Sequence, residues 1–545
     1  MLNDKEIAEE ICKRYGMAVS ERGTLDSHCE EIAQRILPNY KGTFTSWAGQ
    51  TPGQKNTQEM IDATGALALT RFAAAMESML TPRSSTWHTV SASDRSLMKD
   101  RDTRLWFDEL TETLFRYRYA PKANFASQKH EDYMSLGAFG TGALFIDQLD
   151  KRYGPGLRYS AVHLGQIHFL TNHQGIVDTA FRRFELTARQ AKQEFGDMLP
   201  ADIITAAGDT KNCDKKYWFI HCVKPREEVE GYDPKRLDVK GFAFASYYIA
   251  EERKEVVKEG GFANFPYAVS RYVVAPGEVY GRSPAMMALP SIKTLNEQKK
   301  TVLRQGHRAL DPVLLAHDDG VMDSFQLKSG AINFGGVTAE GRPLVHALPV
   351  GNLAVGEKMM EMERAVINDF FLVSLFQILI DTPAMTATEV LERAREKGAL
   401  LSPTMGRQQS ESLGPMIERE VDLLMLQGLL RPMPQALKEA RGEYDIIYDS
   451  PLSRAQKAES VSGFFRVIDW AREYVAITQD PSPLDWVNFD GAMPDILDSQ
   501  GVLGRWQNDL AAVQQIRAGR SQQNQVQQAI QAAPAAAAVM KAQTA

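Results

Sequence analysis

Several features that identify common protein classes are scarce or missing in this sequence. Its four cysteines form no CxxC pair and lie far apart, at Cys12, Cys29, Cys213 and Cys222. Such spacing is typical of free buried thiols in a reducing compartment rather than of a disulfide framework. No apolar run approaches the roughly 18 residues of a membrane span, and the opening MLNDKEIAEEICKRYG is a charged amphipathic pattern rather than a signal peptide. We therefore expect no membrane contact and synthesis in cytosol-like surroundings.

Catalytic signatures are also missing. The sequence has no GxxxxGK[ST] loop and no GxSxG motif. The glycines of GAFGTG, residues 137–142, have the wrong spacing for a dinucleotide-binding loop, and we expect them to form a flexible joint. We expect no cofactor and a structural rather than a catalytic role.

Histidines and acidic residues do not form a recognisable metal site. His163, His168 and His173 fall in a strand-like region, where successive histidines would lie on opposite faces of a sheet rather than around one ion. HDDG, residues 317–320, offers two carboxylates and a histidine, but its glycine-rich surroundings favour a solvated turn over a nuclease-type Mg²⁺ site. We expect no metal.

Composition and charge are those of an ordinary globular protein. The 545 residues are 44% hydrophobic and 24% charged, and their formal net charge is -7. This length allows roughly three or four domains, and the composition argues against disorder and against a basic nucleic-acid binder. If the protein handles DNA, its contacts must come from local groups of Lys and Arg on an acidic body.

Helices dominate the first part of the chain. Apolar residues recur at helical spacing over 4–37 and 57–80, a third helix spans 101–119, and a fourth precedes Gly137. On the second helix we expect one shared face made of Met60, Ala63, Leu67, Thr70, Ala74 and Leu80. On the third helix we expect Leu105, Leu110 and Leu114 to point inward. This opening segment is predicted to be helical.

Short alternating runs separated by Gly and Asn turns follow, as in antiparallel strands. They are ALFIDQL, LRYSAVHL, QIHFLTN and VDTAFRRFEL between 143 and 186, then KKYWFIHCVK, FAFASYYIAEE and YAVSRYVVA up to residue 275, with two short helices between the sets. Residues 143–275 are therefore predicted to form an α+β body.

A long helix then lies between two β-rich segments. Ser283 as N-cap and Pro284 in the first turn start it, and Asp311-Pro312 ends it after Leu310. An apolar seam runs along this helix and consists of Ile292, Leu295, Val302 and Ala309. A charged face consists of Lys293, Glu297, Lys300, Arg304 and Arg308. A solvated helix face would explain such a charged stripe on its own.

A glycine-rich β excursion over 311–352 and a return helix over 354–373 complete an extended hairpin with a tip. Two paired long helices cannot bury their flanks alone. Neighbouring copies should therefore cover them, and repeated heterologous contacts usually close into a ring.

Beyond the hairpin the pattern is again helical. The apolar run 375–380 breaks at Asp381-Thr382-Pro383, and a capping box of Thr386 with Glu389 starts a helix that runs toward residue 430. Pro403 and Pro415 must kink or break this helix. The Gln/Ala-rich tail, 521–545, is predicted to be partly helical with a mobile end.

Four stretches, in this order along nearly the whole chain, resemble the portal (head-to-tail connector) proteins of short-tailed double-stranded-DNA phages. They are RFAAAMESMLTPRSSTWHTV, EDYMSLGAFGTGALFID, GEVYGRSPAMMALPSIKTLNE and YDIIYDSPLSRAQKAE. The resemblance implies a dodecameric ring at one capsid vertex, which forms the channel for genome packaging by a terminase and for DNA ejection and carries the tail.

The resemblance also implies a part for each segment within a predominantly helical α+β portal fold. The expected parts are a wing (1–282), stem helix 1 (283–310), a clip (311–352), stem helix 2 (353–373), a tunnel loop (374–387), a kinked helix returning to the wing (388–449) and a crown with the Gln/Ala tail (450–545). The long helix would then be a wall of a tube that joins wing to clip.

The implied partners are further copies of the chain, non-specific double-stranded DNA in the channel, the terminase large subunit, the major capsid and scaffolding proteins, and the tail adaptor and internal core proteins. The implied location is the portal vertex of the virion, after synthesis in the cytoplasm of a bacterial host. The alternatives are another virion scaffold or tail-ring protein, or a hydrolase or nuclease that would use His317 or Asp318.

Two sets of residues follow as candidate sites. The channel candidates are Lys293, Lys300, Arg304 and Arg308, which could equally form salt bridges to an adjacent subunit. The tunnel-loop candidates are Asp381, Thr382, Pro383, Ala384 and Met385. Sparse basic rings on an acidic protein would centre a duplex without gripping it.

Overall fold

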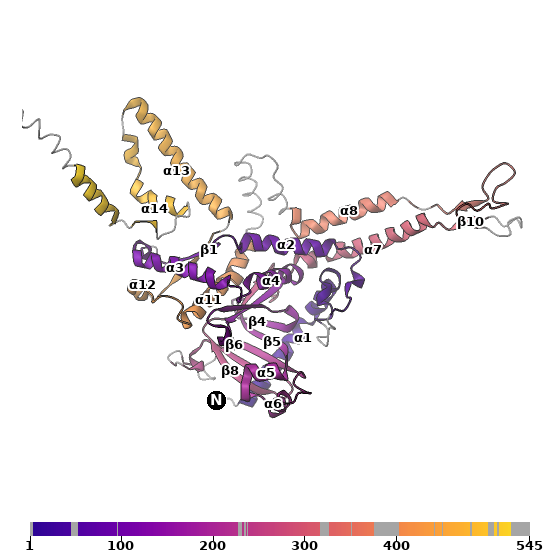
Figure 1. Ribbon diagram of the computed structural model, residues 1–545, viewed down its shortest axis with the longest axis horizontal. Coiled ribbons are helices and arrows are strands. Elements are labelled where there is room, and N and C mark those ends of the chain that lie inside the picture. The colour runs from indigo at the N-terminus through magenta and orange to yellow at the C-terminus, as the bar shows by residue number, and fades with distance from the viewer. Residues whose placement is uncertain are drawn as a thin grey trace, which may run out of the picture. The chain divides into compact units, whose positions relative to one another are not determined.

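The computed structural model describes residues 4–44, 53–94, 96–226, 232, 233, 236, 238–316, 326–349, 351, 353–374, 403–440, 442–449, 451–479, 482–499, 506–508 and 512–524 (Figure 1). The chain forms two compact units. Unit 1 is Met1–Thr81 with Tyr119–Leu423, and unit 2 is Pro82–Arg118 with Leu424–Ala545. Both contain helices and strands, which confirms the α+β class.

Three helices open unit 1, namely α1 (Asp4–Ile36), α2 (Thr64–Leu80) and α4 (Phe125–Phe139). The predicted first helix is confirmed. The second helix begins at Thr64 rather than at residue 57. At this start, Asp62 Oδ1 accepts a hydrogen bond of 2.9 Å from the Thr64 N–H. Its predicted face is wrong, since Leu67 is 57% exposed while Leu69 and Phe72 are buried. Spacing alone did not identify the face that packs on α4.

A five-stranded antiparallel sheet of order β4-β5-β6-β7-β8 is the largest sheet among the described residues of unit 1. Its strands are β4 (Ile167–Thr171), β5 (Val177–Thr187), β6 (Lys216–Pro225), β7 (Phe244–Ala250) and β8 (Glu255–Phe262). The sequence predicted all of these strands except β8, whose EVVKEGGF ends in two glycines and a phenylalanine.

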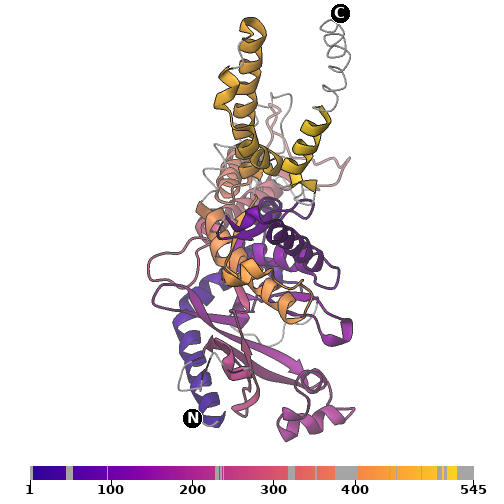
Figure 2. The same ribbon diagram turned by 90° about the vertical axis from the view of Figure 1, so that its left-hand side faces the viewer.

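Helices cover both faces of this sheet (Figures 1 and 2). Ala8, Ile11 and Ala18 of α1 pack on one face, against side chains that include Cys222 and Tyr247. The opposite face is covered by α5 (Ala188–Phe195) and α6 (Ala201–Gly208), which pack against Phe219, Ala250 and Val257. The alternation of β-strand side chains thus supplies two separate cores.

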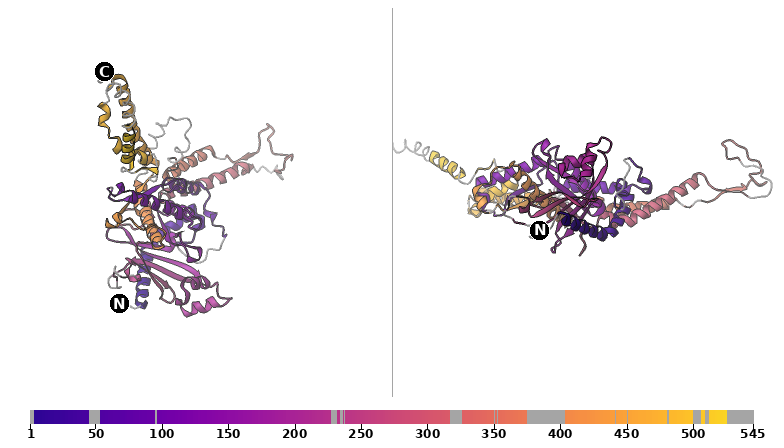
Figure 3. Two further views of the ribbon diagram at one scale, coloured as in Figure 1. Left: turned by 60° about the vertical axis from the view of Figure 1, so that its left-hand side comes forward. Right: turned by 90° about the horizontal axis from the view of Figure 1, so that it is seen from below.

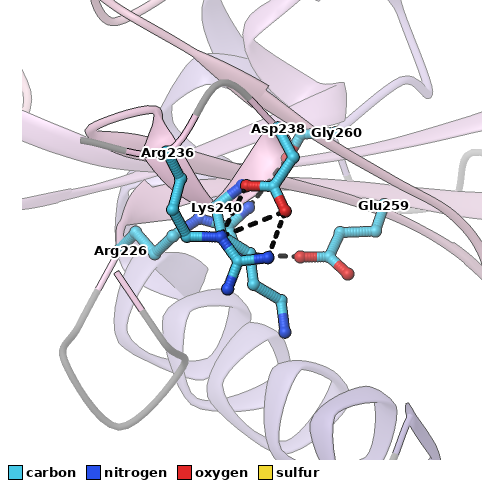
Figure 4. A network of polar contacts seen from close by, with 6 residues as sticks. All are labelled: Arg226, Arg236, Asp238, Lys240, Glu259 and Gly260. Atoms are coloured by element: carbon cyan, nitrogen blue, oxygen red, sulfur yellow. Dashed lines mark hydrogen bonds and ion pairs between the residues drawn. The ribbon is translucent and has the colours of Figure 1, made fainter. Parts of the chain in front are cut away.

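Charged side chains fasten the end of β6 to β8 (Figure 4). The buried guanidinium of Arg226 donates from Nη1 to Glu259 Oε1 at 2.7 Å and from Nη2 to the Gly260 carbonyl at 3.0 Å. Beside it, Arg236 pairs with Asp238, and the Asp238 carboxylate also accepts from the Lys240 N–H at 3.2 Å. The guanidinium charges of Arg226 and Arg236 are therefore each compensated by a carboxylate in the same unit.

A second sheet of order β3-β2-β9 packs beside α4. Its strands are β2 (Thr141–Gln148), β3 (Leu157–Ala161) and β9 (Tyr267–Arg271), all antiparallel.

The glycines of GAFGTG, at the end of α4 and the start of β2, do not form a flexible joint, so this prediction is wrong. A Cβ atom on Gly137 would lie 2.6 Å from Leu69 Cδ1, and one on Gly140 would lie 2.2 Å from the Gly281 carbonyl oxygen. Gly140 also has a φ of +77°, which favours glycine. These glycines allow close packing.

A buried polar network joins α4, β9 and a kinked helix. Lys129 Nζ lies 2.8 Å from Asp132 Oδ2 and 2.9 Å from Ser412 Oγ. Ser270 Oγ of β9 donates to Asp132 Oδ1 at 3.0 Å.

The kink itself is a π-helical turn, Gln409–Leu413, between the helical residues 403–408 and α11 (Gly414–Leu426). Pro415 lacks the N–H of a regular helix, so the predicted disturbance of the helix near this proline is confirmed.

The predicted hairpin is confirmed as α7 (Pro284–Leu310), the strands β10 (Leu314–Ala316) and β11 (Val345–Ala347), and α8 (Leu353–Phe370). The two strands pair antiparallel. Figure 1 and the right-hand view of Figure 3 show α7 and α8 side by side, with β10 beyond their far ends. The apolar seam is buried only at Ile292 and Leu295, since Val302 is half-buried and Ala309 is exposed.

Unit 2 combines segments that are far apart in the sequence. The strands β1 (His88–Ala92) and β12 (Tyr444–Tyr448) pair antiparallel. The helices are α3 (Arg101–Arg118), α12 (Gln435–Glu439), α13 (Pro451–Thr478), α14 (Phe489–Ser499) and residues 512–524. Leu110 and Leu114 are buried as predicted, and Leu105 is half-buried. The predicted helix at the start of the Gln/Ala tail is confirmed up to residue 524.

Candidate functional site

The base of the α7–α8 hairpin is fixed by Ser283. Its hydroxyl accepts a hydrogen bond of 2.9 Å from the Met286 N–H and donates one of 2.8 Å to the carbonyl of Ala138 at the end of α4. The predicted N-cap is therefore confirmed, and the same side chain attaches the helix to the body of unit 1. Such a cap contributes about 1 kcal/mol.

Asp62 ties both helices of the hairpin to the body. Its Oδ2 lies 3.1 Å from Lys299 Nζ of α7 and 2.9 Å from Arg364 Nη2 of α8, and its backbone N–H donates to Asn296 Oδ1 at 2.8 Å. Burial alone would raise the pKa of Asp62, but hydrogen bonds from Thr64, Arg364 and Lys299 outweigh it and hold this pKa well below its usual range. The carboxylate is thus charged at neutral pH and binds two cations.

Two of the four predicted channel residues have partners within the chain. Lys293 Nζ lies 2.6 Å from Glu31 Oε1 of α1, and this hydrogen bond lowers the pKa of Glu31. Lys300 Nζ lies 3.3 Å from Glu297 Oε1 on the same helix. All these side chains are at least partly exposed, so the pairs add little stability. They do, however, reduce the positive charge of the stripe.

Arg304 and Arg308 differ from these lysines. Both are exposed, and the structure shows no ion pair for either within the described residues. α8 packs on α7 near Val302, because a Cβ on Gly356 would lie 2.6 Å from Val302 Cγ2. Arg304 and Arg308 follow Val302 by two and six residues, which corresponds to roughly 200° and 240° around the helix. The arginines therefore lie on the face of α7 that points away from α8.

An exposed apolar stripe on α8 was missed in the sequence. Its members, with exposed fractions between 42% and 59%, are Val355, Met359, Met362 and Val366. Their spacing of four, three and four residues places them on one face of a helix, and this signal was readable in the sequence. The side chains that α8 buries instead are Met360 and Ile367.

Other predicted positions lie outside the described residues. They are the tunnel-loop candidates Asp381, Thr382, Pro383, Ala384 and Met385, and the HDDG stretch with His317 and Asp318. The tunnel loop and the alternative nuclease site both remain predictions.

Of the three histidines in the strand region, His168 is buried, His163 is half-buried against aromatic rings, and His173 is exposed in a turn. His163 stacks on Tyr40 with ring centroids 4.8 Å apart and accepts at Nδ1 from the Gly165 N–H at 2.9 Å. Burial, with a smaller contribution from Arg22, lowers its pKa to about 3.

Over the described ranges no three His, Cys, Asp or Glu side chains come together as metal ligands would. Among the helices in those ranges, none is both long and apolar enough to cross a bilayer.

Comparison with known proteins gives one consistent result. Residues 8–505 match the family described as bacteriophage head to tail connecting protein. The chain is 26% identical over 538 residues to the portal protein of Salmonella phage epsilon15, which covers 97% of this chain and 94% of that protein. It is 26% identical over 465 residues to the probable portal protein of Bordetella phage BPP-1, with coverage of 84% and 81%.

Proposed function

Since this chain belongs to the bacteriophage head to tail connecting protein family, we propose that it is the portal subunit of a short-tailed phage. A portal protein and a probable portal protein of two phages, each similar to this chain along most of its length, support this role. Proteins of this family are structural components of the virion, associated with capsid and tail, and not enzymes. In this proposal, twelve copies of the chain form a ring at one capsid vertex. A terminase packages the genome through this ring, and the DNA later leaves through it.

The observation that carries the proposal is the α7–α8 hairpin. Its base is fastened to unit 1 by Ser283 and Asp62, while its outer part exposes apolar side chains from both helices. Groups of exposed apolar side chains of this kind usually mark interaction sites. Neighbouring copies around a ring would cover them, and the hairpins together would form the wall of a channel.

The proposed parts follow the family assignment. The wing is 1–282, the stem is 283–310 with 353–373, the clip is 311–352, the tunnel loop is 374–387, and the crown is 450–545, with 388–449 returning to the wing. The specific binding partners that we propose for the ring are the terminase large subunit, the tail adaptor, the major capsid and scaffolding proteins, and internal core proteins.

DNA in such a channel should be held weakly. The formal net charge of -7 repels phosphate on average, and Lys293 and Lys300 are partly neutralised by Glu31 and Glu297. Arg304 and Arg308 are the better channel candidates, because both are exposed on the face of α7 that points away from α8. Repeated around a ring, each arginine would become a band of positive charge.

Negative-stain electron microscopy of the purified full-length chain, with particle mass measured on the same sample, tests the proposal. Isolated rings with a central hole and the mass of a dodecamer are expected. Closed shells or stacked tubes would instead indicate another virion scaffold or a tail protein. A chain that stays monomeric or dimeric in every buffer would contradict the ring.

A further inference from the structure

The α7–α8 hairpin carries two separate exposed apolar surfaces. The α8 stripe is Val355, Met359, Met362 and Val366, and the α7 patch is Leu303 and Leu310, whose side chains are 52% and 88% exposed. Both surfaces lie on helices rather than on loops. Their side chains are therefore presented by a rigid backbone.

These surfaces lie on opposite sides of the hairpin. The two helices run antiparallel and touch at Val302 and Gly356. Each residue turns the helix by about 100°. In an antiparallel pair, the residue that follows the contact residue on either helix therefore lies on one side of the pair, and the residue that precedes it lies on the other side. Leu303 comes one step after Val302, whereas Val355 comes one step before Gly356. The α7 patch and the α8 stripe therefore face in opposite directions.

The position of Asp62 agrees with this arrangement. It binds Lys299 and Arg364, and helical periodicity places both of these residues on the same side as the α7 patch. The body of unit 1 thus covers that side of the hairpin near its base and leaves Leu303 and Leu310 exposed farther out. The α8 stripe, on the other side, stays exposed as far as Val366.

The charges of the two helices are complementary. α7 contains five Lys or Arg residues and one Glu, but Lys293, Lys299 and Lys300 have carboxylate partners within the chain, so its positive charge comes mainly from Arg304 and Arg308. α8 contains four Asp or Glu residues and two Lys or Arg, of which Arg364 is bound to Asp62. A contact between α7 of one copy and α8 of another would bring opposite charges together. A contact between two α8 helices would bring like charges together. Electrostatics therefore favours unlike surfaces in contact.

We propose that the α8 stripe of one copy packs against the α7 patch of the next copy, so that the hairpins associate head to tail. This inference rests on the proposed ring and names the surfaces that build it. Two unlike surfaces on opposite sides of one element can repeat from copy to copy until the ring closes, whereas a self-complementary surface would stop at a dimer.

Two variants separate the surfaces. Variant A carries Met359→Lys and Met362→Lys, which disrupt the α8 stripe but leave the α7 patch intact. Variant B carries Leu303→Asp and Leu310→Asp, which disrupt the α7 patch but leave the α8 stripe intact. Ala365, exposed on α8 outside the stripe, provides the matched controls Ala365→Lys and Ala365→Asp. Circular dichroism and thermal unfolding show whether each variant is folded.

Mass photometry of each protein, alone and mixed, then gives the result. Wild type and both Ala365 controls should form rings, whereas A alone and B alone should be single chains. An equimolar mixture of A and B should give a species of two chains and nothing larger, because only one pair of intact surfaces remains.

Different failures have different meanings. Rings formed by folded A or folded B would overturn the proposed contact while leaving the portal function in place. A dimer of B alone would show that α8 stripes pair with each other, and absence of the mixed dimer would also contradict head-to-tail pairing. If wild type forms no ring, the proposed function itself is wrong.

Discussion

The two halves of α7 are equally helical but have opposite surroundings. In the first half, Ala285, Ala288, Ile292 and Leu295 are buried by the body of unit 1, whereas Leu303 and Leu310 in the second half are exposed. The body also pairs its buried charges, as at Lys129 and Asp132. The comparison shows that the inner half of α7 belongs to a buried core, whereas the outer half exposes apolar side chains, as the proposed interface requires. Substitutions should therefore alter stability in the body and assembly in the hairpin.

The largest loss of stability is expected from Lys129→Met. This change leaves the buried Asp132 carboxylate without its cation, and breaking a buried pair in this way costs about 3–5 kcal/mol. Denaturant unfolding measures the difference. Lys216→Ala is the control, because Lys216 pairs with Glu185 at the surface and should change the free energy of unfolding by less than about 1 kcal/mol. Equal effects would remove the distinction between buried and exposed charge.

The next largest loss should come from Gly137→Ala. The added methyl group would meet Leu69 and Phe72 at less than 3 Å, and overpacking of this kind costs about 1–3 kcal/mol. Gly23→Ala in α1 is the matched control, since nothing packs within 4 Å of the place that its methyl group would take, and alanine favours a helix by up to about 1 kcal/mol. Melting temperatures should move in opposite directions. A rise for Gly137→Ala would restore the flexible-joint interpretation.

Acid should weaken the body through its buried histidines. Burial lowers the pKa of His163 to about 3, whereas an unfolded chain binds a proton on histidine below about pH 6.5. The free energy of unfolding therefore falls as pH falls from about 6.5 toward 3. Between pH 7 and pH 5, wild type should lose about 1–2 kcal/mol more than His163→Phe. Parallel pH profiles would show that His163 does not contribute.

The smallest effect on stability should come from Arg304→Gln with Arg308→Gln. Both arginines are exposed, so the free energy of unfolding should stay within about 0.5 kcal/mol of wild type, and rings should still form. DNA retention in packaged particles should fall if these arginines line the channel. Lys293→Gln with Lys300→Gln is the comparison and should have less effect, since those lysines already have carboxylate partners. Unchanged retention in the arginine variant would remove its channel role.

Local signals predicted the hairpin well. Ser283 with Pro284 marked the start of α7, and Asp311-Pro312 marked its end, because capping and the missing proline N–H act within one turn of the chain. The α8 stripe could have been found by the same reasoning, since its spacing is helical. Long-range features could not be found in this way. Asp62 lies 237 residues from Lys299 and 302 from Arg364, and no periodicity connects them.

The sequence by itself determined the helices, most of the strands, the hairpin and, through four stretches in a characteristic order, the family. These depend on hydrophobic spacing, on caps and on residue identity along a continuous chain. Only the tertiary structure decided that the GAFGTG glycines are close-packed, that Lys293 pairs with Glu31, and that the α8 stripe and the α7 patch face opposite ways. Such features depend on which distant segments meet, because packing and charge pairing act across space rather than along the chain.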